Sequence, residues 1–455
     1  MKTILKIFFL FLSIFALNAQ EERWNWEDID VHSSVFPKDF MWGIGLAEYQ
    51  YSGAINCPHS NWATWEKGPY QQHRSSWACN FWNSSEQVIT SAQKLGVNAL
   101  RFSVEWGNIE PEEGQFNPAA IKHYQDLCDA LIKAGIKPIV TLHHFTHPQW
   151  FEEKGAFEKK SNISYFVRFC ETMFNALGDR VSLWCTINEP TVYMLQGYMR
   201  GVYPPGVCNI GKAGRVLRNL LTAHVAVYKK IKSLPGGEDA HVGIVHNILQ
   251  FHPFSDTSYA EASVCRQFNH IMNECVMQFF ETGKFRFDVP LFARLRSNNP
   301  DAPHSLDFIG LNYYSHVLLQ YTGIFNNFFQ DGYRNIDIKT DMPYAFYPEG
   351  FYDAIKQVSV FNVPIYITEN GIADVQDNKR ELFIRRYLYA LSQAIDDGFD
   401  VRGYIYWSLF DNFEWDMGYT QKFGLFNYNF NEQQATLRPG GRAYRDIIKE
   451  HQTKN

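Results

Sequence analysis

Short apolar runs, poor in charge and often β-branched, recur along the chain and are separated by longer amphipathic stretches. A run without polar–apolar alternation is typical of a strand that is buried on both faces, as in a parallel sheet. The runs are also too short for most helices. Eight strands are therefore predicted: Met41–Ala47, Val97–Val104, Pro138–His143, Ser182–Asn188, His241–Asn247, Asp307–Tyr313, Pro364–Glu369 and Arg402–Ser408.

Helices are predicted between these runs. The clearest one begins at Asn117-Pro118, because Asn accepts hydrogen bonds from the free N–H groups of a first helical turn and Pro fits that turn. Gly135 supplies the left-handed residue that ends this helix. A shorter helix is predicted over Glu86–Leu95, ended by Gly96. The apolar face of the first helix consists of Ile121, Tyr124, Leu127, Cys128 and Leu131.

Strands that alternate with helices predict a parallel sheet, and eight such units are the number that closes a (β/α)8 TIM barrel. An open, doubly wound sheet is the alternative. The G-x-G-x-x-G turn that would favour this alternative does not follow the first predicted strand. No linker, short repeat or low-complexity tract divides the chain, so one α/β domain is expected over residues 35–451. Its chemistry should lie at the carboxyl ends of the strands.

The first residues have the three-part pattern of a secretory signal peptide. Lys2 and Lys6 give a basic start, residues 7–16 are apolar, and Ala19 offers a cleavage point. An uncleaved membrane anchor is the alternative, but the apolar run is short for a spanning helix. We expect residues 1–19 to be removed, leaving a soluble, secreted or periplasmic protein without a membrane partner.

Composition narrows the possible partners. Of the 455 residues, 45% are hydrophobic and 20% are charged, which excludes disorder and collagen-like structure. The net charge of −6 provides no basic footprint for nucleic acid. Aromatic residues make up 16% of the chain. Most of them must belong to the core, while a minority could form flat walls on which a sugar stacks.

The eight cysteines are too few for a disulfide scaffold, and none has the C-x-x-C spacing of zinc and redox motifs. Export permits disulfides. Cys57 and Cys79 flank a loop-like stretch and are the pair expected to form a bridge. Cys128 and Cys170 lie on apolar helix faces, where buried free thiols are expected.

Two predicted strands end in a glutamate beside an asparagine. The fourth ends in Asn188-Glu189-Pro190, and the seventh ends in Thr368-Glu369-Asn370. A single Glu at such a place often marks only the entry to a solvated loop. Two of them, at different points around one barrel mouth, indicate a functional site, because a pair of carboxyl groups can split a glycosidic bond.

Other strand ends carry supporting groups. The second strand includes Arg101, whose guanidinium can hold a carboxylate ionised and oriented. The third strand ends at His143 and is followed by His144 and His147, yet no acidic ligand follows at helical spacing. We therefore expect a histidine that bonds a ligand hydroxyl rather than a metal site.

The eighth strand is followed by two tryptophans with an acid between them. Trp407 stands at its end, and Glu414 and Trp415 follow shortly after. This set suits a polyol ring, because indoles stack on its C–H faces and a carboxylate accepts from its hydroxyls. An interpretation of both tryptophans as core residues explains the rings but not the acid.

These pieces resemble glycoside hydrolase family 1, the β-glucosidase family, from about Phe36 to Tyr444. Each piece is short, but their combination in this order is specific. The resemblance implies a retaining, exo-acting β-glycosidase on a (β/α)8 barrel, with a β-linked glycoside or oligosaccharide as substrate and no cofactor. The pieces are Phe40-Met41-Trp42-Gly43, Tyr49-Gln50, Arg101-Phe102-Ser103, Asn188-Glu189-Pro190, Thr368-Glu369-Asn370-Gly371, Trp407-Ser408-Leu409 and Glu414-Trp415.

The resemblance also implies roles. Glu369 resembles the nucleophile and Glu189 the acid/base. Arg101 and Tyr314 resemble the groups that keep the nucleophile ionised. Asn188 resembles the residue that binds the sugar hydroxyl beside the cleaved bond. The positions that resemble the pocket for the non-reducing sugar are Gln50, His144, Asn312, Trp407, Glu414, Trp415 and Phe423.

Phe145 departs from the family, which usually has Trp at this position. A ring without an N–H lacks one contact to a sugar hydroxyl, so galactose and fucose stay open beside glucose, the first choice. A 6-phospho-β-glycosidase would need cationic groups where Glu414 stands. A sugar-binding, receptor-like pseudoenzyme would usually lack one of the two glutamates. A transglycosylase would share all these residues.

Overall fold

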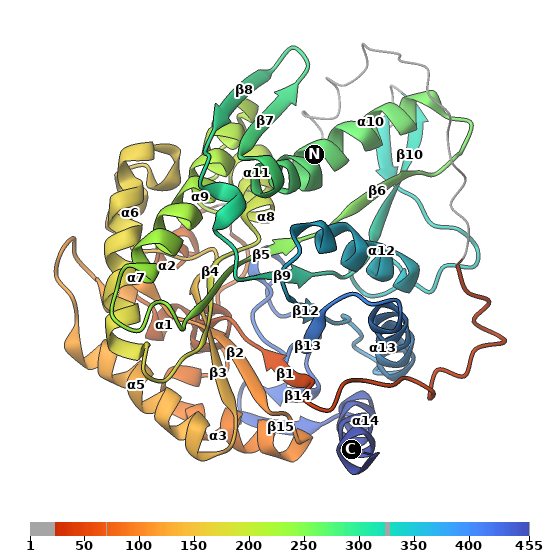
Figure 1. The fold of residues 1–455 in the computed structure, drawn as a ribbon, viewed down its shortest axis with the longest axis horizontal. Helices are drawn as coiled ribbons and strands as arrows, with labels where there is room; N and C mark the ends of the chain where they lie inside the picture. The colour runs from red at the N-terminus through yellow and green to blue at the C-terminus, as the bar shows by residue number, and fades with distance from the viewer. Residues whose placement is uncertain (1–22, 70, 324–327, 455) are drawn as a thin grey trace.

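The predicted barrel is confirmed by the structure, a computed structural model that describes residues 23–69, 71–323 and 328–454 (Figure 1). Eight parallel strands close in the order β1-β13-β12-β9-β5-β4-β3-β2. The predicted signal peptide, residues 1–19, lies outside the described part. The barrel strands are β1 Met41–Gly45, β2 Ala99–Ser103, β3 Lys137–His143, β4 Leu183–Asn188, β5 His241–Asn247, β9 Phe308–Asn312, β12 Ile365–Asn370 and β13 Val401–Trp407.

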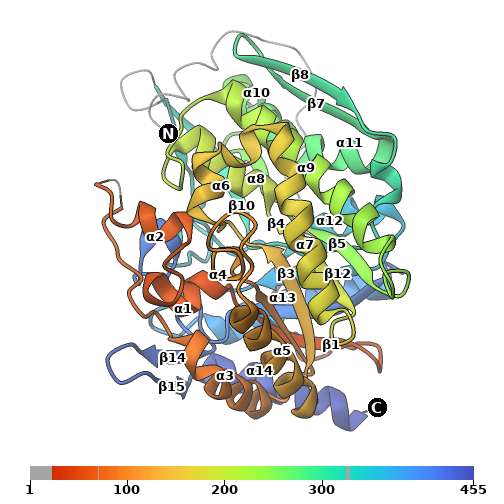
Figure 2. The ribbon, with the colours of Figure 1, turned by 90° about the vertical axis from the view of Figure 1, so that its left-hand side faces the viewer.

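Helices cover the outside of the barrel, and Figure 2 shows α5, α7 and α9 along one side of it. No helix in the described ranges is both long enough and apolar enough to cross a bilayer. The α-helices are α1 Glu48–Asn56, α2 Asn61–Trp65, α3 Phe81–Leu95, α4 Trp106–Ile109, α5 Pro118–Lys133, α6 Gln149–Glu153, α7 Ile163–Leu177, α8 Pro190–Met194, α9 Ile210–Lys232, α10 Tyr259–Asn269, α11 Cys275–Thr282, α12 Pro348–Val358, α13 Arg380–Asp396 and α14 Pro439–Lys454. Shorter helical turns are η2 Ala156–Glu158, η3 Lys160–Asn162, η4 Leu195–Arg200, η5 His270–Glu274, η6 Ala302–His304, η7 Ser359–Phe361 and η8 Trp415–Met417.

The helix α5 follows its predicted ends. The side chain of Asn117 accepts hydrogen bonds from the backbone N–H groups of Ala119 and Ala120, which caps the first turn. The prediction for α3 was wrong at its start, because the helix begins at Phe81 and not at residue 86. Ser84 leaves helical geometry within it, and this irregular first turn hides the start from a periodicity argument.

Successive side chains of a strand point to opposite faces, so every second residue of a barrel strand points into the barrel, and this places the polar groups there. On β2, Ala99 belongs to the apolar interior and Arg101, two residues on, points to the same side. On β3, Ile139 and Thr141 have the same relation, and Arg101 Nε donates to Thr141 Oγ1 at 3.0 Å. Arg101 therefore lies next to a layer of apolar side chains inside the barrel. This layer consists of Met41, Ala99, Ile139, Leu183, Cys185, Val245, Phe308 and Ile405.

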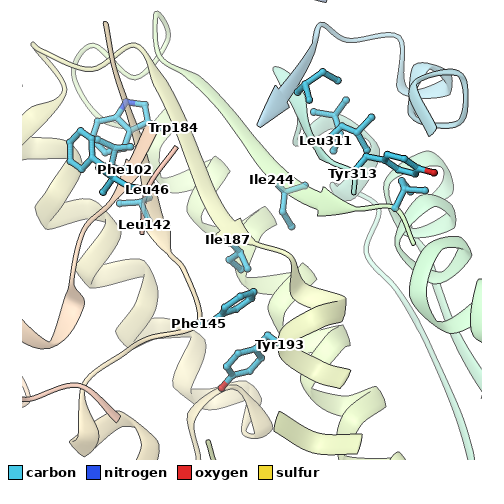
Figure 3. Close-up of a cluster of buried hydrophobic side chains, with 14 of the residues drawn as sticks. Leu46, Phe102, Leu142, Phe145, Trp184, Ile187, Tyr193, Ile244, Leu311 and Tyr313 are labelled. Atoms are coloured by element: carbon cyan, nitrogen blue, oxygen red, sulfur yellow. The ribbon is translucent and has the colours of Figure 1, made fainter. Parts of the chain in front are cut away.

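The strand residues that face outward pack against the helices. Figure 3 shows part of this larger core, including Phe102 of β2, Leu142 of β3 and Ile244 of β5. All three are fully buried. Each barrel strand has one face in the barrel interior and the other against the helices. The strands therefore appear in the sequence as continuous apolar runs.

Among the described residues, three small sheets lie outside the barrel, and none of them was predicted. They comprise the sheet β11-β10-β6, the hairpin β7-β8 and the hairpin β14-β15. Their strands are short or lie at a surface, so no continuous apolar run marks them. Their bounds are β6 Gln250–Pro253, β7 Lys284–Val289, β8 Ala293–Asn298, β10 His316–Gly323, β11 Phe328–Asp331, β14 Phe426–Asn429 and β15 Gln434–Leu437.

The expected bridge between Cys57 and Cys79 is wrong, since both are free, buried thiols. The Cys79 thiol donates instead to the backbone oxygen of Asp411 at 3.2 Å. Burial raises the pKa of the Cys57 thiol well above its usual value, and the nearby Glu105 adds to this. Each of the two sulfurs is therefore buried separately and is not bonded to the other. Cys128 and Cys170 are buried free thiols, as expected.

Candidate active site

The structure brings the two strand-end glutamates to the same mouth of the barrel. Glu189 directly follows β4, and Glu369 is the penultimate residue of β12. Both are buried. Glu189 has a left-handed backbone (φ 44°), and its N–H donates to the oxygen of Val245 on β5 at 2.9 Å. Such a conformation is uncommon for a residue with a side chain and is typical of functional sites.

Glu369 accepts hydrogen bonds from two side chains. Arg101 Nη1 donates to Oε1 at 2.6 Å, and the Tyr314 hydroxyl donates to Oε2 at 2.8 Å. Burial, the largest single effect, opposes the charge of Arg101, but Glu369 together with Cys185 and Glu189 outweighs burial, so the pKa of Arg101 is raised. Charge-assisted bonds of this kind stabilise an ionised, oriented carboxylate.

Glu189 lies in a different environment. Its Oε1 accepts from Asn312 Nδ2 at 2.8 Å and from Asn247 Nδ2 at 2.9 Å, both neutral donors. Burial and the charge of Glu369 raise the pKa of Glu189 to about 8, against the smaller opposing effects of the two amides and Arg101. Glu189 therefore favours the protonated form that a general acid needs, while the other carboxyl, Glu369, is bound by a guanidinium and a phenol.

One hydrogen-bond network joins the two carboxyls. Arg101, which holds Glu369, also donates through Nη2 to Asn188 Oδ1 at 2.6 Å. Asn312, which holds Glu189, donates to the same oxygen at 3.3 Å. The route from Glu369 to Glu189 therefore passes through only three side chains, and all of them are buried.

The network also fixes the tautomer of His144. Because Asn188 Oδ1 accepts from Arg101 and Asn312, its Nδ2 donates to His144 Nε2, 3.2 Å away. The proton of the neutral ring must then sit on Nδ1. Burial, with Arg101 adding to it, lowers the pKa of His144 well below its usual value. The buried Nδ1 has no hydrogen-bond partner among the described residues, so it leaves a donor for a ligand oxygen.

Aromatic rings form walls beside this donor. The His144 ring stacks on Trp407 at 5.9 Å and on Trp415 at 6.2 Å, between ring centroids. Phe423 packs with Trp407 and contacts the ring of Tyr314 at 6.0 Å. The expected pocket residues therefore come from separate segments of the chain to one place, where flat rings can face a sugar.

Polar groups of the pocket meet at Gln50. Its Nε2 donates to Glu414 Oε2 at 3.3 Å and to the backbone oxygen of Phe413 at 2.9 Å. Its buried Oε1 has no partner among the described residues. Burial, followed by the charge of Glu369, raises the pKa of Glu414 to about 8. The pocket thus offers a free acceptor, Gln50 Oε1, as well as the free donor on His144, and sugar hydroxyls can bond to both.

Phe145 lies beside this pocket, with a left-handed backbone (φ 69°). Its ring is 5.4 Å from that of Trp415, edge to face.

The other two histidines, at the end of β3 and shortly after it, bond to each other and to an acid, not to groups of this pocket. His143 Nε2 lies 3.3 Å from His147 Nδ1, and His147 Nε2 lies 2.9 Å from a Glu152 oxygen. Within the described ranges, no group of three or more His, Cys, Asp or Glu side chains is placed to hold a metal ion.

Sequence reasoning missed several residues of the site. Asn247 ends β5 and bonds Glu189, so the rule that polar strand ends carry function would have found it. Thr368 Oγ1 donates to Asn312 Oδ1 at 2.7 Å and so fixes the direction of that amide. Tyr203 packs on the Trp415 ring at 5.9 Å from a loop without any pattern that marks it in the sequence.

Comparison with known proteins agrees with this geometry. The model of Glycosyl hydrolase family 1 matches residues 32–453. The chain belongs to glycosyl hydrolase family 1. This family 1 enzyme is 30% identical to a beta-glucosidase A from Acetivibrio thermocellus, over 91% of this chain and 98% of that protein. It is 31% identical to a 6-phospho-beta-galactosidase from Clostridium acetobutylicum, over 91% of this chain and 97% of that protein.

Among solved structures, the family 1 enzyme resembles a beta-glycosidase from Pyrococcus horikoshii. The TM-score is 0.82 and the identity 34%, over 92% of this chain and 95% of that one. The family expected from the motifs is thereby confirmed, and with it a retaining β-glycosidase of the O-glycosyl hydrolase class.

Proposed function

We propose that this family 1 enzyme is an exported β-glucosidase in which Glu369 is the nucleophile and Glu189 the acid/base. The observation that carries the proposal is the contrast between the two carboxyls. Glu369 is held by a guanidinium and a phenol, while Glu189 receives only neutral amide bonds and has a pKa raised to about 8. A retaining mechanism requires such a pair, with carboxyls about 5–5.5 Å apart.

In the first step, the ionised Glu369 attacks the anomeric carbon while Glu189 gives its proton to the departing oxygen. The bond to the aglycone breaks and a glycosyl ester forms on Glu369. In the second step, Glu369 carries no charge, so Glu189 holds its proton less strongly and can serve as a base. Glu189 takes a proton from water, and the resulting hydroxyl replaces the ester with net retention.

The proposed sugar is a terminal, non-reducing β-D-glucosyl residue. The His144 N–H and the Gln50 amide oxygen are a free donor and a free acceptor, and Glu414 adds a carboxyl group whose pKa is raised to about 8. Trp407 and Trp415 provide apolar faces beside them. A panel of nitrophenyl β-glycosides that differ only in the sugar tests this assignment. The highest kcat/KM should fall on the glucoside, and a higher value for the galactoside or fucoside would replace glucose in the proposal.

Export is proposed from the basic start, apolar run and Ala19 of residues 1–19. Expression of the full chain in a host that secretes proteins should yield a product that begins at residue 20, as measured by N-terminal sequencing. A product that retains residue 1 and sediments with membranes would contradict cleavage.

The proposed role of Glu189 predicts a pH dependence. A general acid acts only when protonated, and burial together with the Glu369 charge raises the pKa of Glu189 to about 8. We therefore expect kcat/KM for a nitrophenyl β-glucoside to be maximal below pH 8 and to fall with a midpoint near pH 8. Because the pKa of Glu414 is also about 8, the Glu414→Gln variant is the control. The alkaline limb should persist in that variant, and its disappearance would assign the limb to Glu414.

A second candidate, hydrolysis of a 6-phosphoglycoside, arises because several relatives are 6-phospho-beta-galactosidases. Glu414 argues against it, because its carboxyl group supplies no positive charge to bind a phosphate and, once ionised above its pKa of about 8, repels one. Changing Glu414 to Gln should lower kcat/KM for nitrophenyl β-glucoside about 10- to 100-fold, because a buried hydrogen bond to a sugar hydroxyl is lost and its partner is left unsatisfied. The ratio of kcat/KM for the 6-phosphate to that for the glucoside should rise. A wild-type enzyme that prefers the 6-phosphate would favour the second candidate.

A further inference from the structure

The hairpin formed by β7 and β8 has no part in the active site. Figure 1 and Figure 2 both show it projecting at the upper edge of the molecule. One of its faces is buried, with Phe285, Phe287 and Val289 in the core. Its tip is apolar and open to solvent, because Leu291 is 74% exposed and Phe292 is 41% exposed.

The outward face of the hairpin is basic, although the chain as a whole has a net charge of −6. Its exposed side chains include Lys284, Arg286, Arg294 and Arg296, against the single acid Asp288. Asp288 pairs with Arg296 at 2.9 Å and reaches Arg294 at 4.0 Å. Arg286 stands directly opposite Arg296 in the register of the two strands. Like charges at such positions destabilise a hairpin.

The tip also carries backbone strain. Val289 pairs with Ala293, so Pro290, Leu291 and Phe292 form a three-residue loop. Leu291 has a φ of 68°, the left-handed conformation that such loops usually assign to Gly. A branched, apolar side chain is therefore held in solvent at a position where Gly would fit with less strain. Both this strain and the opposed arginines act against folding stability, which points to a role in binding.

In place of the expectation that the protein has no membrane partner, we propose that the β7–β8 hairpin docks it on an anionic lipid bilayer. Leu291 and Phe292 insert among the headgroups, and the arginines bind lipid phosphates. An apolar tip flanked by cations suits the boundary between headgroups and acyl chains. A hydrated, anionic polysaccharide would satisfy the arginines but would give the apolar tip no gain. A three-residue tip is also too small for a stable protein–protein interface, which buries about 800 Å² per partner.

Co-sedimentation with unilamellar vesicles tests this proposal. We expect the protein to bind vesicles of phosphatidylcholine with 40% phosphatidylglycerol at about 50 mM NaCl. Binding should be at least tenfold weaker at about 500 mM NaCl and with vesicles of phosphatidylcholine alone, because salt screens the attraction between the arginines and the lipids. Absence of binding to the anionic vesicles at low salt would overturn the proposal.

Two hairpin variants separate docking from folding. Leu291→Gly should bind anionic vesicles less tightly while its thermal midpoint stays equal or rises, because Gly relieves the left-handed strain. Leu291→Ser/Phe292→Ser should weaken binding at least tenfold. The matched control, Ile132→Ser/Leu382→Ser, removes two other exposed apolar residues (48% and 37% exposed) and should bind as the wild type does. Vesicle binding that both tip variants retain, or that the control loses equally, would overturn the proposal, as would binding of an anionic polysaccharide in preference to vesicles.

Discussion

Replacing Glu369 with alanine should lower kcat for a nitrophenyl β-glucoside by about 10⁴-fold or more. The variant cannot form the glycosyl ester, and the remaining pocket can only bind the substrate and donate a proton. Stopped assays with the purified variant, at substrate concentrations above and below KM, measure the loss. The KM should change far less than kcat, because Glu369 acts on the transition state and not on the bound sugar alone.

A small anion provides the sharper part of this test. Added azide fits the space vacated by the carboxylate and attacks the same face of the sugar, so it should restore turnover and give a glycosyl azide of inverted, α configuration. The exposed Glu381→Ala is the matched control and should retain wild-type activity. Unchanged turnover of Glu369→Ala without azide would show that another residue is the nucleophile.

Replacing Glu189 with alanine should have an effect that depends on the leaving group. For an alkyl β-glucoside, whose departing oxygen needs a proton, we expect kcat/KM to fall about 10²- to 10⁴-fold, the usual contribution of a positioned acid. For a dinitrophenyl β-glucoside, formation of the glycosyl ester should be much less affected, because that phenolate departs without protonation. The comparison of kcat/KM across a series of leaving groups measures this difference.

Glu189→Gln serves as the control for shape. It keeps the volume and the bonds to Asn312 and Asn247 in part, but it cannot give up a proton at neutral pH. It should show the same dependence on the leaving group, and its alkaline limb near pH 8 should be absent for the dinitrophenyl substrate. Equal losses of kcat/KM for good and poor leaving groups would contradict the role of Glu189 as acid and indicate a role in positioning.

Much of the barrel can be predicted from the sequence, because a parallel strand that is buried on both faces does not alternate polar with apolar residues. The run at His241–Asn247 became β5 with the same ends. Where local signals are weak, the prediction fails. The first turn of α3 is broken at Ser84, and the hairpin β7–β8 alternates at a surface and resembles a loop. The Cys57–Cys79 pair failed for a different reason, since spacing along the chain says nothing of how two sulfurs pack.

The motifs of the sequence pointed to Glu189 and Glu369, because two carboxylates at the ends of different strands of one barrel lie at the same mouth. What the sequence by itself determined is therefore the barrel, the family and the chemical identity of the pocket groups. Only the tertiary structure decided the pKa values, the tautomer and the hydrogen-bond partners of these groups. The raised pKa of Glu189, the tautomer of His144 and the route through Arg101 and Asn188 arise from contacts between different strands. Burial and charge act through space, and the distances that govern them exist only once the barrel has closed.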